Sequence, residues 1–153
     1  MSYGQQRGNY GRGGGNRRHD GPTIDLSKVV IKAGAEKSLD PELFSDISEQ
    51  IAKTMGDERD APKPTQIRKF FDELVMWEER VRQDEKRFPE YLPFIRMLNA
   101  KAAYAKGRKH VSENFVKLMN HCLKQVDSAE SLRNFKLFFE AFLGFYKLHG
   151  PKG

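Results

Sequence analysis

The fold is decided by residues 127–150, which read DSAESLRNFKLFFEAFLGFYKLHG. The first four, Asp127-Ser128-Ala129-Glu130, have the form of a capping box, in which two side chains bind the free amide groups at a helix start. Apolar residues then recur at spacings of three and four as far as Tyr146, and Gly150-Pro151 ends the pattern. The sequence therefore predicts a long helix with a broad apolar face.

Aromatic residues crowd this predicted helix. Six of them lie between Phe135 and Tyr146, and together they cover more than one face. Packing in a hydrophobic core is the first interpretation. Phe138 and Phe145 lie seven residues apart on the flank of the main stripe, so contact with another subunit is the alternative interpretation for these two.

Four earlier segments also have helical spacing of apolar residues. They cover residues 41–55, 65–87, 112–126, and a segment from Pro89 or Pro93 to Gly107. Gly107 is placed to end its helix as a left-handed cap. Residues 28–32 read briefly as extended. Short connections between the helices predict an all-α fold, a compact bundle of five or six helices.

Residues 1–24 differ in composition from the rest. They hold seven glycines and four arginines, and Ile24 is the first strongly apolar residue after Met1. Such a segment buries too little apolar surface to offset its conformational entropy, so we expect it to be disordered. The expected organisation is an Arg/Gly-rich tail over residues 1–24 and a helical bundle domain over residues 25–153.

The overall composition narrows the class of protein. The chain has 153 residues, a formal net charge of +6 and a single cysteine, Cys122. No internal disulfide can form, which favours a reducing, cytoplasmic location. No apolar run approaches the roughly 18 residues of a membrane span, and the N-terminus lacks the apolar segment of a secretory signal. We expect a cytoplasmic protein without membrane contact.

No residue pattern points to catalysis, a cofactor or a metal. None of the four histidines follows a glutamate at the spacing of a bundle metal site, and one cysteine with scattered histidines offers no zinc spacing. Neither nucleotide-binding glycine loop is present. Cys122 lies beside His121, but adjacent helical residues point about 100° apart, so a buried structural cysteine is favoured over a nucleophile. We expect no enzyme activity, cofactor or metal.

Positive charge concentrates in residues 101–110, which read KAAYAKGRKH and contain no acidic residue. A local positive field beside an aromatic ring suits a sugar–phosphate backbone. A helix C-terminus also attracts cations, so a solvated helix end is the competing interpretation. The missing acid favours the phosphate site, with candidate residues Lys101, Tyr104, Lys106, Arg108 and Lys109.

Two further groups of cations are candidates for RNA contacts. Arg68 and Lys69 lie near a predicted helix start, where the helix dipole disfavours positive charge, although Asp72 and Glu73 offer partial balance. In the tail, Arg-Gly and Tyr-Gly pairs are typical of segments that stack on single-stranded nucleic acid. A flexible solubilising tail is the alternative. The tail candidates are Arg7, Arg12, Arg17 and Arg18.

Two of these patterns together resemble one family. Residues 65–70 read TQIRKF, and residues 101–108 read KAAYAKGR. With Phe138-Phe139-Glu140-Ala141 and Phe145-Tyr146, they resemble the small subunit of type III-A CRISPR effector (Csm) complexes over about residues 40–150. The Arg/Gly-rich tail lies outside the family pattern.

The resemblance implies a non-catalytic protein whose copies stack beside the subunits that hold the guide RNA. The matching RNA-contact positions are Arg68, Lys69, Lys101 and Arg108, to which charge clustering adds Lys106 and Lys109. The leading prediction is an RNA-binding small subunit in antiviral defence, with guide RNA, target RNA, other effector subunits and further copies of itself as partners. The alternative is a helical module that docks acidic proteins without RNA.

Overall fold

The computed structural model describes residues 23–34 and 38–152, and in these ranges every regular element is a helix. This confirms the predicted all-α fold. The elements are η2 (Leu43–Ile47, a π-helix), α2 (Ser48–Gly56), α3 (Pro64–Gln83), η3 (Glu85–Arg87, a 3-10 turn), α4 (Phe88–Arg96), α5 (Leu98–Gly107), α6 (Glu113–Gln125) and α7 (Ala129–His149).

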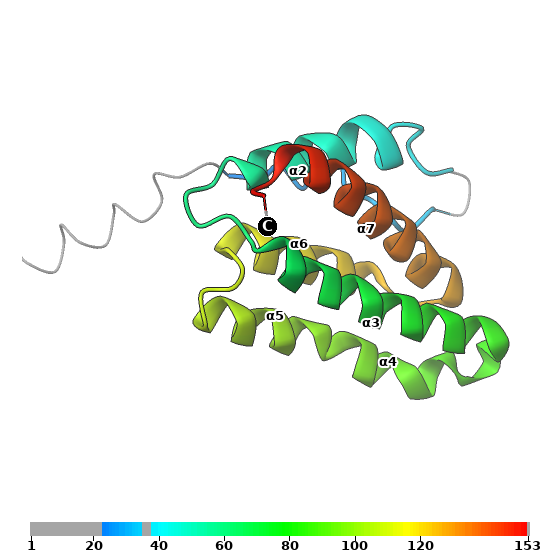
Figure 1. The fold of residues 1–153 in the computed structure, drawn as a ribbon. Coiled ribbons are helices and arrows are strands. Elements are labelled where there is room, and N and C mark those ends of the chain that lie inside the picture. The colour runs from blue at the N-terminus through cyan, green and yellow to red at the C-terminus, as the bar shows by residue number, and fades with distance from the viewer. Residues whose placement is uncertain (1–22, 35–37, 153) are drawn as a thin grey trace, which may run out of the picture.

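The long helix α7 is the centre of the bundle. It packs mainly against α2 and α3, while α5 packs against α6. Figure 1 shows α4 and α5 running one after the other beside α3, with α2 on the opposite side of the molecule. No helix in the described part of the chain combines the length and apolarity needed to cross a membrane.

The predicted apolar stripes form the core. Every apolar stripe residue predicted for α6, from Phe115 to Val126, is completely buried. In α7, Leu132, Phe135, Phe139 and Phe142 are also completely buried. Phe138 is completely buried too, so the alternative prediction of an exposed subunit contact is wrong for this residue. Phe145 is half-buried.

Two predicted helix boundaries are wrong. The second helix ends at Gln83 instead of continuing to residue 87, because Asp84 leaves the helical region with φ −155° and ψ 84°. The chain reverses there and returns beside α3 as α4, which begins at Phe88 with Pro89 in its first turn. The predicted third helix is divided at Met97, whose amide bonds to the Phe94 carbonyl three residues back.

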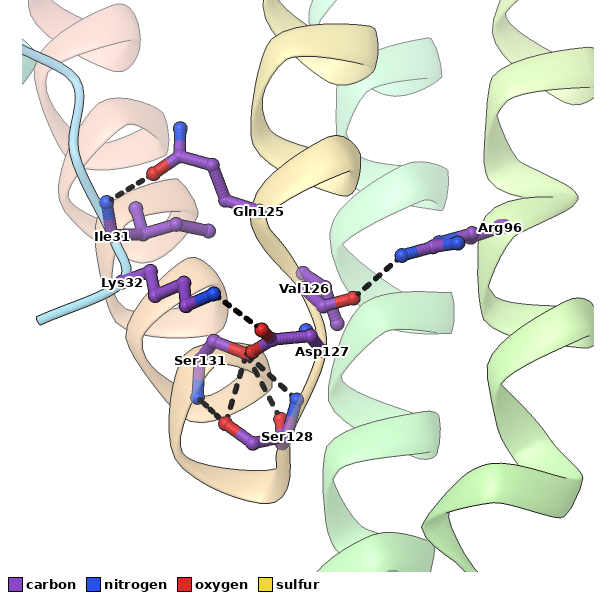
Figure 2. A network of polar contacts seen from close by, with 8 residues as sticks. All are labelled: Ile31, Lys32, Arg96, Gln125, Val126, Asp127, Ser128 and Ser131. Atoms are coloured by element: carbon purple, nitrogen blue, oxygen red, sulfur yellow. Dashed lines mark hydrogen bonds and ion pairs between the residues drawn. The ribbon is translucent and has the colours of Figure 1, made fainter. Parts of the chain in front are cut away.

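The capping box of α7 lies one residue later than predicted. Its N-cap is Ser128, whose hydroxyl accepts from the Ser131 amide, while the Ser131 hydroxyl oxygen accepts from the Ser128 amide (Figure 2). One oxygen of the Asp127 carboxylate lies 3.3 Å from the Ser131 hydroxyl, and the other lies 2.5 Å from the Lys32 ammonium. This ion pair joins the start of α7 to a segment far away in sequence.

That segment, residues 24–32, has a turn at Ser27 and Lys28 and packs against the bundle; we call it the N-terminal strap. Ile24, Val29 and Ile31 are buried, whereas Val30 is 48% exposed. Ile24, the last residue of the predicted tail, is therefore already part of the packed structure. From Val29 to Lys32, buried and exposed side chains alternate, as in an extended chain lying on an apolar surface.

Side chains of α6 and α7 hold the main chain of the strap. The Gln125 carboxamide accepts from the Ile31 amide at 2.9 Å and donates to the Val29 carbonyl at 2.9 Å. His121 Nε2 donates to the same carbonyl at 2.7 Å, and Asn134 donates to the Ile31 carbonyl at 3.0 Å. Figure 2 shows the strap beside the turn that joins α6 to α7, where Arg96 of α4 donates to the Val126 carbonyl. This turn thus connects four parts of the fold.

The end of α5 is closed by Lys109 rather than by Gly107. Gly107 is the last helical residue, while Lys109 has φ 63° and is the only non-glycine residue with positive φ in the described chain. The Lys109 amide bonds to the Lys106 carbonyl at 2.8 Å, and the His110 amide bonds to the Ala105 carbonyl at 2.9 Å. These two bonds define a Schellman motif, and they correct the predicted glycine cap.

The strap predicts a sharp difference between two neighbouring valines. Val29→Ala should destabilise the protein by about 2 kcal/mol, because it removes buried methyl groups and leaves a cavity. Val30→Ala, the same change at an exposed position, should alter stability by less than about 0.5 kcal/mol. Urea unfolding of the full chain measures both values. Equal, small effects would show that the strap is not packed in solution.

The α5 cap predicts the direction of two glycine substitutions. Gly107→Ala should stabilise the protein by about 0.5–1 kcal/mol, because the residue is helical and an added Cβ meets no atom within 4 Å. Lys109→Gly should also stabilise it, by about 1 kcal/mol, because glycine relieves the positive φ. Thermal and urea unfolding show which of Gly107 and Lys109 has the left-handed conformation. If Gly107 had it, the Gly107→Ala variant would be less stable than the unaltered chain.

Candidate nucleic-acid interface

A shallow groove of about 450 Å³ lies between α3 and α5; we call it the α3–α5 groove. It brings Lys69 of α3 together with Lys101, Tyr104 and Arg108 from α5 and its C-terminal turn. Four of the seven residues predicted for the RNA site in the bundle therefore share one surface. The remaining lining residues are Gln66, Phe70, Glu73, Ala105 and His110.

The spacing on α5 explains why these side chains face outward together. Leu98, Ala102 and Ala105 are buried against the bundle, so Lys101, Tyr104 and Arg108 lie on the exposed side. Two of the three buried residues are alanines, which allow α5 to lie close to the bundle. The Tyr104 side chain is 67% exposed, which leaves its ring open to a partner.

Tyr104 and Arg108 interact with each other. The Arg108 guanidinium lies 5.8 Å from the centre of the Tyr104 ring and donates to its hydroxyl at 3.2 Å. This contact joins positions one helical turn apart. It presents a cation and an aromatic face side by side at the mouth of the groove.

Acidic residues from other helices balance part of the positive charge. Both oxygens of Glu73 lie 2.8 Å from the Lys101 ammonium, and Lys106 lies 3.0 Å from Glu113. Residues 101–110 contain no acidic residue, but the tertiary fold brings Glu73 and Glu113 to them. Exposed ion pairs of this kind contribute little to stability. The ammonium groups therefore exchange a carboxylate for another anion at low cost.

His110 lines the same groove and Lys63 is bonded to it, and sequence reasoning named neither as a site residue. The Lys63 amide donates to the His110 carbonyl at 3.1 Å, which ties the loop before α3 to the turn after α5. Partial desolvation, together with the positive charges of Lys63, Arg108 and Lys69, lowers the pKa of His110. The contact depends on the bundle topology, and no local sequence pattern marks it.

Arg68 lies on a different surface from its neighbour Lys69. It lines a second groove of about 790 Å³ between α3 and α7, with Lys147 and Lys152 nearby, and it pairs with Asp72 at 3.2 Å. The helix separates adjacent residues by about 100°, so one faces α5 and the other faces α7. The predicted two-residue cluster is thus divided.

The other predicted residues lie outside the α3–α5 groove. Lys106 and Lys109 are exposed at the end of α5. The tail candidates lie outside the described residues (Arg7, Arg12, Arg17 and Arg18).

Cys122 is a core residue, as predicted. It is completely buried, and burial raises the pKa of its thiol. The adjacent His121 uses Nε2 for the Val29 carbonyl of the strap. In residues 23–34 and 38–152, no three His, Cys, Asp or Glu side chains gather closely enough to hold a metal ion.

Comparison with known proteins identifies the family. The chain matches the family model described as Csm2 Type III-A over residues 38–152, a range that contains every helix described above. The N-terminal strap precedes the matched range. No curated protein and no solved structure matches the chain. Both halves of the α3–α5 groove lie inside the match, and the resemblance seen in the sequence is confirmed: the chain belongs to the Csm2 type III-A family, a small subunit of type III-A Csm effector complexes.

Proposed function

We propose that this small subunit binds RNA in the effector complex without catalysing a reaction. The α3–α5 groove contacts the sugar–phosphate backbones of guide and target RNA, while copies of the chain stack with one another and with other subunits. The complex acts in antiviral defence in the cytoplasm, and RNA cleavage belongs to other subunits. The observation that carries this proposal is the convergence of Lys69, Lys101 and Arg108 beside the exposed Tyr104.

The chemistry of the groove supports contact with a phosphate backbone. Its cations come from two helices and line an open groove rather than a closed pocket. Lys106 and Lys109 extend the positive field beyond the groove at the exposed end of α5. Backbone contacts of this type give affinity with little sequence preference. The open groove suits a continuous strand better than a small molecule.

Charge reversal in the groove is expected to weaken RNA binding strongly. The variant Lys69→Glu with Arg108→Glu should also make the affinity less dependent on salt, with the slope of log K against log salt falling by roughly 1.4 for two lost single-strand phosphate contacts. Fluorescence anisotropy with a labelled unstructured RNA, measured at several salt concentrations, determines both quantities.

A matched control variant distinguishes a localised RNA site from a general effect of the net charge. Lys53→Glu with Arg133→Glu changes the net charge equally, and both residues are exposed on α2 and α7, away from the groove. This variant should retain most of the affinity. Equal loss in the two variants contradicts a localised site. Protein partners retained after nuclease treatment, without RNA affinity, would favour the acidic-protein module instead.

His110 is expected to couple RNA binding to pH. Its pKa is lowered in the free protein by partial desolvation and neighbouring cations, and bound phosphates favour the protonated imidazole. Binding therefore takes up a proton, so affinity should rise by up to about fivefold between about pH 8 and about pH 6. His110→Gln should remove this increment while leaving affinity at high pH nearly unchanged. An identical pH profile in the variant would exclude His110 from the contact.

A further inference from the structure

An aromatic cluster lies between the C-terminal half of α3 and α4, beyond the α3–α5 groove. Near the end of α3, Glu78 is buried, whereas Trp77 is half-exposed. The Trp77 ring stacks on Phe94 of α4 at 6.2 Å with an interplanar angle of 15°, and it lies 5.6 Å from Tyr91. Phe94 is 55% exposed, so a flat apolar face remains open to solvent.

Arginines cover two of these rings. The Arg80 guanidinium lies 5.4 Å from the centre of the Trp77 ring, and the Arg87 guanidinium lies 5.2 Å from the centre of the Tyr91 ring. Guanidinium and aromatic planes in this arrangement offer stacking surfaces together with charged donors. The same pairing occurs at Tyr104 and Arg108 in the α3–α5 groove.

Glu73 connects the cluster to the groove. One of its oxygens accepts from Trp77 Nε1 at 3.3 Å, and both oxygens bind the Lys101 ammonium. The outward side of α4 and α5 continues the connection through exposed residues, and the half-buried Tyr91, at helical spacing. We call the whole surface the aromatic–basic strip; its members on α4, α5 and the turns beside them are Arg87, Tyr91, Phe94, Met97, Lys101, Tyr104 and Arg108, and those on α3 are Lys69, Glu73, Trp77 and Arg80.

The charge of the strip indicates the class of partner. It carries five cations and one carboxylate, that of Glu73, while Glu90 beside the strip pairs with Arg87 at 3.3 Å. An apolar protein surface laid over the strip would bury unpaired cations, which is costly. A strand of nucleic acid supplies phosphates for the cations and planar bases for the rings. The presence of both kinds of side chain on one surface therefore favours a single strand of nucleic acid, and the proposed function indicates that this strand is RNA.

We infer that the aromatic–basic strip binds single-stranded RNA with bases stacked on its aromatic side chains, in addition to the backbone contacts of the α3–α5 groove. This inference rests on the proposed function and names its substrate class: a strand with unpaired bases rather than a double helix. From Arg87 to Arg108 the strip follows about 30 Å of helix, at 1.5 Å per residue. That length accommodates a segment of several nucleotides.

Trp77 provides a direct test, because it is the only tryptophan of the chain. The full chain is titrated with an unstructured mixed-sequence RNA of about 15 nucleotides, with an abasic strand of equal length and charge, and with a duplex. The mixed-sequence RNA should quench Trp77 fluorescence. The abasic strand should bind the cations without quenching, and the duplex should quench much less. Equal quenching by all three probes would overturn base stacking.

Phe94→Ala is the decisive variant. It should weaken binding of the mixed-sequence RNA by about five- to tenfold and leave binding of the abasic strand unchanged, because a base loses its stacking partner. Phe44→Ala is the matched control, since Phe44 is 37% exposed on η2 and lies outside the strip. Its RNA affinity should equal that of the unaltered chain, and both variants should remain folded at the temperature of the binding measurements.

The remaining outcomes separate the two proposals. If RNA binds and responds to charge reversal at Lys69 and Arg108, but Phe94→Ala has no effect and Trp77 is not quenched, the stacking inference is wrong and the proposed function stands. If none of the probes binds, both fail. If Phe94→Ala instead abolishes capture of a purified effector subunit without affecting RNA, the cluster is a protein contact and the inference is overturned.

Discussion

The aromatic contacts around Phe139 are the constraint on which the rest of the structure depends. Its ring meets Phe71 of α3, Phe115 of α6 and, within α7, Phe135 and Phe142, at distances of 5.6–6.3 Å between ring centres. Phe115 also meets Phe70 of α3 at 5.1 Å. Edge-to-face contacts restrict ring orientation as well as distance. Three helices are therefore fixed in their rotation about their own axes by one group of rings.

The rotation of α3 decides the chemistry of the surface. Because Phe70 and Phe71 point inward to Phe115 and Phe139, Lys69 lies on the side of α5 and Arg68 on the side of α7. The same rotation directs Glu73 to Lys101 and exposes part of Trp77 beside Phe94. A core of neutral rings thus arranges the cations that face outward, and the surface proposed to bind RNA depends on the packing beneath it.

The N-terminal strap is held against the bundle by polar side chains of α6, α7 and the turn between them. Gln125, His121 and Asn134 bind main-chain groups of the strap, so they recognise an extended backbone while the buried Val29 and Ile31 supply apolar contact. Ser128, rather than the predicted Asp127, caps α7, and Asp127 forms an ion pair with Lys32. Such side chains appear in the sequence as ordinary polar residues of a helix, because their partners lie more than 90 residues away.

The sequence by itself determined the all-α class, the apolar stripes of α6 and α7, the burial of Cys122, the family, and the basic character of residues 101–110. Helical periodicity and composition are local properties, which a linear pattern records fully. Only the tertiary structure decided that Arg68 and Lys69 lie on different surfaces, and that Glu73 and Glu113 balance Lys101 and Lys106. It also placed His110 in the groove, where its carbonyl accepts from the Lys63 amide. It also decided that Lys109, rather than Gly107, takes the left-handed position. These features depend on the rotation and crossing of helices, which are set by side-chain packing between distant segments and leave no periodic trace in the chain.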